Sequence, residues 1–264
     1  MRFGLEVLEA IRHDIGEDYV VGIRMSGDEM LRGGLNQDDC AAIAKIYAGS
    51  GLIDFISVVG AQPTDTLSVA KIWPTMWVPT AAFLPLAGAI KAVSDVPVFH
   101  ATRITDAATA VYAVSEGLVD MVGMTRAFIA DPYHVRKLEA GEERHIRPCV
   151  GVGYCIDRVI SGADALCVHN VATSREQHLP HVIRSAPGRK HRVVVVGGGP
   201  GGLEAARVCA SRGHQVILYE ATADLGGQVV LAAKATWRAG PVSYTHLRAH
   251  ETLRYLVCRL LLEK

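Results

Sequence analysis

Apolar residues alternate between helical and strand spacing along the first part of the chain. The spacing predicts helices over residues 2–15, 36–48, 84–93, 106–116 and about 131–140. Short apolar runs predict strands over residues 19–24, 54–59, 96–101 and 120–124. Four strand-then-helix units with short links predict parallel strands joined by helical crossovers. The long loop over residues 60–80 follows the second strand and is expected to line a site.

An arginine stands at or just after the end of three predicted strands: Arg24, Arg103 and Arg126. Because the carboxyl ends of parallel strands meet at one face, the three guanidinium groups should project there together. A single arginine would be best explained as a surface ion pair, but three at equivalent positions favour a bound anion. The backbone N–H groups expected to approach the same anion belong to Thr102, Gly123 and Thr125.

A Gly-rich stretch over residues 147–176 has little hydrophobic periodicity and holds three of the six cysteines, Cys149, Cys155 and Cys167. The N-terminus has the pattern of an amphipathic helix and not of a signal peptide, so a cytoplasmic location is the default expectation. In the cytoplasm, clustered cysteines are better explained as metal ligands than as disulfides.

A second strand–helix–strand pattern follows the cysteines. Apolar residues 192–196 lead into a turn in which Gly197, Gly199 and Gly202 fill the glycine positions of G-x-G-x-x-G. The next predicted strand, residues 215–220, ends in Glu220. This arrangement places a pyrophosphate at a helix N-terminus and an acid near a ribose hydroxyl, so it predicts a dinucleotide site.

Charge and composition narrow the range of partners. Half of the 264 residues are apolar, and 27 basic residues balance 27 acidic ones. A formal net charge of zero gives no reason to expect nucleic acid or an anionic membrane as a partner. No apolar run is long enough to span a bilayer. We expect a cytoplasmic enzyme with a small-molecule substrate.

Four motifs in this order resemble the old yellow enzyme-like NADH:flavin oxidoreductases: I-R-M-S, V-F-H-A-T-R-I, D-M-V-G-M-T-R-A-F-I-A-D-P and I-R-P-C-V-G. They are most similar to the branch that contains trimethylamine dehydrogenase, 2,4-dienoyl-CoA reductase and the dimethylglycine-type N-demethylases. The resemblance covers the chain from Met1 to about Gly240. It implies the C-terminal half of a TIM (β/α)8 barrel, a cysteine-rich linker and the start of a Rossmann-type FAD/NAD(P)-binding domain.

The resemblance also implies cofactors and roles. FMN would sit at the barrel mouth, with Arg24 facing the pyrimidine edge of the flavin. Its phosphate would be held by Thr102, Arg103, Gly123, Thr125 and Arg126, although many relatives have glycine where this chain has the two threonines. The segment from Asp224 to Gln228 resembles the one that follows the first FAD-binding unit of disulfide-reductase-like domains, which favours FAD or an ADP moiety over NAD. No residue can be assigned as the catalytic acid or base.

The cysteine segment is similar to the iron–sulfur motif of the family but departs from it at Val152, where a second cysteine is usual. Three thiolates remain where a [4Fe–4S] cluster normally takes four. One interpretation keeps the cluster with another fourth ligand, and a second has the cluster lost. A third is zinc with His145 or His169 as the additional ligand. The V-G-x-x-Y-C variant itself resembles the N-demethylase-like relatives.

The resemblance sets the expected domain limits. Residues 1–145 would be the second half of the barrel, 146–186 the iron–sulfur-type segment, and 187–240 a truncated Rossmann unit. Residues 241–264 match none of the family patterns and resemble the translation of a sequencing-library adapter, so we expect an artefactual tail. The four counted strands resemble the last four of eight, and half a barrel would leave parallel sheet edges and one core face exposed.

The expected function is therefore that of a fragment of an FMN-dependent oxidoreductase acting on N-methylated amines. The first alternative is an NAD(P)H-dependent enoate or 2,4-dienoyl-CoA-type reductase. The second is a non-catalytic fragment or electron-transfer module. NAD(P)H or an electron-transfer protein would be the redox partner, and the full-length protein would form a homo-oligomer. We expect the fragment by itself to be inactive.

Overall fold

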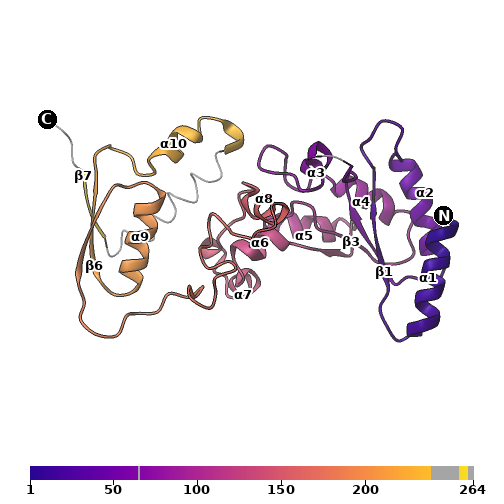
Figure 1. The fold of residues 1–264 in the computed structure, drawn as a ribbon, viewed down its shortest axis with the longest axis horizontal. Coiled ribbons are helices and arrows are strands. Elements are labelled where there is room, and N and C mark those ends of the chain that lie inside the picture. Colours follow the sequence, from indigo (N-terminus) through magenta and orange to yellow (C-terminus); the bar gives the residue numbers. More distant parts are fainter. Residues whose placement is uncertain (65, 239–255, 261–264) are drawn as a thin grey trace. The chain divides into compact units, whose positions relative to one another are not determined.

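The structure, a computed structural model, describes residues 1–64, 66–238 and 256–260. The chain divides into two compact units, Met1–Ala163 and Asp164–Lys264. Figure 1 follows both along the chain, the first unit from indigo to magenta and the second in orange and yellow. Each unit is described by itself below.

The first unit is a four-stranded parallel sheet with helical crossovers. Its strands run in spatial order β1 (Gly22–Ser26), β2 (Phe55–Val59), β3 (Val98–His100) and β4 (Met121–Val122). The helices are α1 (Arg2–Ile15), α2 (Gln37–Ala48), α3 (Thr66–Ile72), α4 (Leu84–Lys91), α5 (Ala107–Ser115), α6 (Thr125–Ala130), α7 (His134–Glu139) and α8 (Tyr154–Ile160), with a 3-10 turn at Glu143–His145. The predicted parallel α/β fold is confirmed.

Local sequence accounts for several element limits. The Asn36 side chain accepts hydrogen bonds from the N–H groups of Asp38 and Asp39, and the Asp39 carboxylate accepts one from Asn36 N–H. This capping box starts α2 at the predicted position. The helix predicted over about residues 131–140 is α7, and a separate short helix that was not predicted, α6, precedes it. Pro132 explains the break between the two helices, since it has no N–H group and disfavours helical geometry at Asp131.

The first strand begins at Gly22 and not at residue 19 as predicted. Tyr19 and Val20 are exposed, and Val21 N–H donates to the Asp54 carboxylate over 2.6 Å. Arg12 Nη2 donates to the same carboxylate, also over 2.6 Å. Asp54 thus ties the end of α1 and the start of β1 to the residue before β2, so β1 pairs in parallel with β2 only from Gly22 onward.

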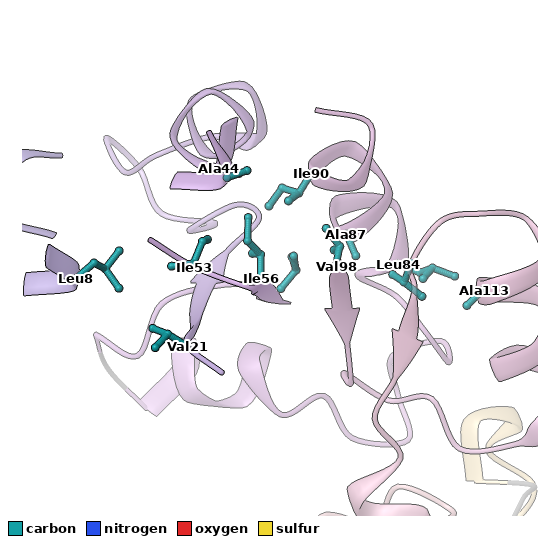
Figure 2. Close-up of a cluster of buried hydrophobic side chains, with 13 residues drawn as sticks. Leu8, Val21, Ala44, Ile53, Ile56, Leu84, Ala87, Ile90, Val98 and Ala113 are labelled. Carbon is teal, nitrogen blue, oxygen red and sulfur yellow. The ribbon is translucent and has the colours of Figure 1, made fainter. Parts of the chain in front are cut away.

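One face of this sheet carries the core of the unit. Ile56, Val58 and Val98 are fully buried there, packed beneath α2 and α4 with Ala44, Ala87 and Ile90 among their neighbours (Figure 2). Burying such side chains is the main favourable contribution to folding. His100 is also fully buried, with Nδ1 2.9 Å from Val58 O. It is therefore a core histidine.

The opposite face of the sheet lines a cavity of about 340 Å³. Phe55 and Phe99 stack there with ring centroids 4.7 Å apart, and Met121 is half-exposed. A Cβ on Gly22 would lie 2.2 Å from the Phe55 ring, so only glycine fits beneath this stack. This second face therefore carries apolar rings together with the polar side chains of Arg24 and Ser57.

The second unit is a strand–helix–strand arrangement. Its elements are β5 (Arg192–Val196), α9 (Pro200–Ser211), β6 (Gln215–Glu220), α10 (Gln228–Ala232), a 3-10 turn at Thr236–Arg238 and β7 (Leu256–Leu260). The three strands are parallel in the order β5-β6-β7. Leu203, Ala206, Val216 and Leu218 form its buried core.

Most of the segment expected to be an artefactual tail lies outside the described residues. Its residues 256–260 are described, and they form β7 alongside β6. The artefact interpretation stays a prediction. Within the described part of the chain, no helix combines the length and apolar character that a bilayer crossing requires.

Candidate functional site

A cationic site lies in the first unit, near the carboxyl ends of β3 and β4. Arg103 follows β3 and has a φ of 54°, an uncommon value for a residue other than glycine. Its backbone carbonyl accepts a hydrogen bond from Ala81 N–H over 3.0 Å. Its side-chain Nε and Nη1 are buried and have no hydrogen-bond partner among the described residues. Buried polar groups are normally paired, so these donors point to a missing anion.

Arg126, on α6, is close enough to act electrostatically on Arg103. Burial, and then the neighbouring Arg126 cation, lower the pKa of Arg103, while Cys149 opposes them. Arg126 Nη1 donates to Pro74 O over 2.8 Å. Two neighbouring guanidinium groups that form no ion pair with a carboxylate of the described residues repel each other, and a dianion such as a phosphate would offset that repulsion.

Two backbone segments enclose this pair. Met76 N–H donates to Gly151 O over 2.7 Å, which joins the loop before α4 to the start of the cysteine segment. A Cβ on Gly151 would lie 2.1 Å from Arg103 Nη1, and one on Gly153 would lie 2.9 Å from Thr75 Cγ2. The loop over residues 60–80 therefore borders the site, although it also contains α3.

The remaining predicted phosphate ligands occupy different environments. Thr102 is buried, with 8% of its surface exposed, and Thr125 is exposed at the first position of α6. Gly123 N–H donates to His100 O over 2.8 Å. This N–H group is therefore used in pairing the chain after β4 with β3 and is not available to an anion. A Cβ on Gly123 would lie 2.7 Å from Ala101 Cβ, so packing explains the glycine.

Arg24 is placed differently from Arg103 and Arg126. It lies within β1 and not at its end, because the strand continues beyond the predicted end to Ser26. Its exposed side chain donates from Nε to Ser57 Oγ over 3.3 Å and lines the cavity on the open face of the sheet. The structure therefore brings Arg103 and Arg126 together and puts Arg24 on the sheet face beside Ser57.

The three cysteines divide between the two units. Cys149 and Cys155 belong to the first and Cys167 to the second. Burial, and then the neighbouring Cys149 thiol, raise the pKa of Cys155, while Arg126 opposes them. Val152 between them is exposed. No group of three or more His, Cys, Asp or Glu side chains in the described ranges is arranged to hold a metal ion, whether or not His145 or His169 is included.

The Gly-rich turn of the second unit has the geometry of a pyrophosphate cradle. Gly197 has a φ of 102°, and α9 begins after Gly199 without a side-chain cap. A Cβ added to Gly199 or Gly201 would meet nothing within 4 Å. The open N–H groups of the first helical turn are the donors that phosphate oxygens use.

Glu220 closes this cradle at the end of β6. Its Oε2 accepts a hydrogen bond from Gly198 N–H over 2.6 Å, and its Oε1 accepts one from Thr222 N–H over 2.9 Å. The backbone N–H groups of Thr222 and then Gly198 hold the pKa of Glu220 below its ordinary value. The carboxylate is thus charged and oriented, as a ribose-binding acid should be.

The chain thus combines a parallel α/β unit, in which Arg103 and Arg126 lie beyond the ends of β3 and β4, with a second unit that has a Gly-rich strand-to-helix turn. Residues 1–145 match the NADH:flavin oxidoreductase / NADH oxidase family, and residues 192–257 match the FAD dependent oxidoreductases. The chain belongs to the NADH:flavin oxidoreductase / NADH oxidase family.

The chain is also similar to several individual proteins. The chain is 51% identical over 239 residues to N,N-dimethylglycine/sarcosine dehydrogenase of Chromohalobacter salexigens, covering 90% of this chain and 34% of the relative. It is 48% identical over 239 residues to the multifunctional alkene reductase/demethylase OYE of Caballeronia cordobensis, with the same coverage of 90% and 34%. Histamine dehydrogenase from Rhizobium sp. 4-9 superposes with a TM-score of 0.89 at 26% identity, covering 100% of this chain and 38% of that chain. The chain thus spans about a third of the length of these curated relatives.

Proposed function

We propose that the complete protein containing this chain is an FMN-dependent enzyme that oxidises N-methylated amines. The single observation that carries the flavin site is the half-buried Arg103 side chain, whose buried Nε and Nη1 have no partner among the described residues and which lies near Arg126. The amine class rests on the similarity to the dimethylglycine/sarcosine dehydrogenase and on the V-G-x-x-Y-C variant of the cysteine segment.

When bound, FMN supplies the chemistry that accepts two electrons and a proton from the substrate. Arg103 and Arg126 bind its phosphate. The backbone at Gly151, which packs against Arg103 Nη1 and forms one wall of the site, excludes water from that contact. Arg24 places a cation at the open sheet face, where it favours negative charge on a ligand. The Gly-rich turn and Glu220 hold FAD, or an ADP moiety, by its pyrophosphate and ribose.

The cysteines fit an iron–sulfur cluster incompletely. They offer three thiolates where [4Fe–4S] takes four, and the described residues gather no three metal ligands. No step of the reaction is therefore assigned to a cluster. The hypothesis that one is present is checked separately by the iron and acid-labile sulfide content of the protein.

The test uses the complete gene product. Under anaerobic conditions, sarcosine or N,N-dimethylglycine should bleach the visible flavin absorbance and release formaldehyde after hydrolysis of the oxidised N-methyl group. The Arg103→Gln variant should lose FMN while retaining adenine nucleotide in the second unit. A flavin that neither amine reduces would overturn the amine proposal.

The name of the Caballeronia relative supports a second candidate, reduction of an activated alkene. In that case NAD(P)H would bleach the flavin and an enoate would restore its absorbance. A preparation with iron but no flavin would favour the electron-transfer module, and one with neither would favour the non-catalytic fragment.

A further inference from the structure

The carboxylate of Asp131 is buried and accepts hydrogen bonds from three residues, Tyr133, Lys137 and Arg147. It is 2% exposed, and it forms an ion pair with Lys137 Nζ. It also accepts hydrogen bonds from Tyr133 N–H over 3.0 Å and from Arg147 N–H over 2.9 Å. The hydrogen bond from Arg147 N–H links this carboxylate to the segment that follows α7 and leads to Cys149.

Lys137 reinforces this connection. Besides contacting Asp131, its Nζ donates to His145 O over 2.8 Å. The pair therefore holds the chain at two points, residues 145 and 147, immediately before Cys149. A buried carboxylate paired in this way is costly to disturb, because removing one partner leaves the other group buried and unpaired.

The held segment then forms one wall of the cationic site. Gly151 lies four residues beyond Arg147. Its carbonyl oxygen accepts a hydrogen bond from Met76 N–H, and its backbone packs against Arg103 Nη1. Its φ of 71° and the lack of room for a Cβ leave little freedom at this point. A shift of the chain at Arg147 would therefore be transmitted to the Arg103 guanidinium.

We propose that Asp131 is a positioning residue for the anion site: through Arg147 N–H it fixes the Gly151 wall that holds Arg103 in place. The inference rests on the proposed function, since it takes FMN phosphate as the ligand of Arg103. Asp131 acts through the backbone and touches no substrate or cofactor.

Asp120 offers a matched control within the same unit. Its carboxylate also binds a lysine, Lys91 Nζ over 2.8 Å, and a backbone group, Val98 N–H over 2.7 Å. Asp120 thus combines a lysine and a backbone N–H group as Asp131 does, but the backbone group that it holds is at the start of β3 and not before the cysteine segment. Asp120→Asn should lower stability with little effect on FMN, whereas Asp131→Asn should weaken FMN binding roughly tenfold, the scale of one lost charge-assisted hydrogen bond.

A second pair of variants isolates the hydrogen bond in case Asp131→Asn does not fold. Arg147→Pro removes the N–H group, and Arg147→Ala removes the same side chain but keeps the N–H. Ile146, with φ −70° and ψ 132°, already has the extended conformation that a residue before proline adopts. Arg147→Pro should weaken FMN binding roughly tenfold relative to Arg147→Ala.

The measurements are the FMN dissociation constant of the complete gene product and hydrogen exchange at Met76 N–H. Asp131→Asn should weaken binding and speed exchange at Met76, whereas Asp120→Asn should do neither. Arg147→Pro should show both effects relative to Arg147→Ala. Equal FMN affinity in Arg147→Pro and Arg147→Ala would overturn the positioning role. If the wild type itself binds no FMN, the proposed function fails, while Met76 exchange still tests whether Asp131 holds the wall.

Discussion

Gly202 lies so close to Gly197 that a Cβ on Gly202 would come within 1.9 Å of the Gly197 carbonyl oxygen. The first turn of α9 therefore packs directly on the strand-to-helix turn. Gly201, one residue earlier, has nothing within 4 Å of an added Cβ. Two adjacent glycines thus differ sharply in how much space surrounds them.

This difference predicts opposite effects of the same substitution. Gly202→Ala should push α9 away from the turn, cost roughly 1–3 kcal/mol of stability in the second unit and abolish binding of FAD or ADP. Gly201→Ala should leave stability nearly unchanged, because its Cβ would point into open space. Calorimetry with ADP and thermal unfolding would measure both. Equal ADP affinity in the two variants would argue against a cradle at this turn.

Arg103→Gln should separate cofactor binding from stability. It removes a buried cation that lies beside Arg126, so the protein without FMN should be as stable as the wild type or more stable. Its affinity for FMN should fall at least about tenfold. Fluorescence titration with FMN would measure the affinity, and thermal unfolding without FMN would measure the stability.

Arg12→Gln is the matched control for that prediction. Arg12 binds the Asp54 carboxylate and donates to Leu52 O over 2.9 Å and Tyr19 O over 2.7 Å. Its loss should lower stability and leave FMN affinity unchanged. If Arg103→Gln instead behaves like Arg12→Gln, Arg103 has a structural role and does not bind an anion.

Local pattern was enough to predict most of the fold. The limits of α1 and the Asn36 cap of α2 follow from short-range chemistry, and so does the Gly-rich turn before α9. The order of strands and helices then determines that the sheet is parallel. The extra helix α3 was missed because residues 66–72 lie in a stretch bounded by prolines, which resembles a loop.

The candidate site was predicted less completely, because tertiary contacts complete it. Arg24 was expected at a strand end, but β1 keeps pairing with β2 as far as Ser26, so Arg24 lies in the middle of the strand. Gly123 was expected to offer an N–H to an anion, but sheet pairing uses it. The wall at Gly151 depends on a contact with Met76, far away in sequence, which no local pattern encodes.

Asn36→Ala tests the capping box as a purely structural element. The substitution leaves the N–H groups of Asp38 and Asp39 without their acceptor, which should cost about 1 kcal/mol. FMN affinity should stay at the wild-type value, because α2 contributes no residue to the cationic site. Thermal unfolding and FMN titration would measure the two effects. A loss of FMN affinity would mean that α2 influences the site.

Acid should remove the contribution of Asp131 to stability. Burial alone would raise the pKa of Asp131, but Lys137 and the N–H groups of Arg147 and Tyr133 outweigh it and hold the pKa below its ordinary value. A carboxyl group with a lowered pKa stabilises the folded state fully above its unfolded-state pKa, and that contribution is lost as pH falls through the folded-state pKa.

The stability difference between wild type and Asp131→Asn should therefore be largest near neutral pH and should shrink as the pH falls below about 4. Hydrogen exchange of the α6 and α7 amides at several pH values, corrected for intrinsic rates, measures it locally. Gly201→Ala is a suitable reference, because its effect involves no titrating group and should not change with pH. A difference for Asp131→Asn that is equally large at pH 7 and in acid would show that Asp131 stabilises this region by packing and not by its charge.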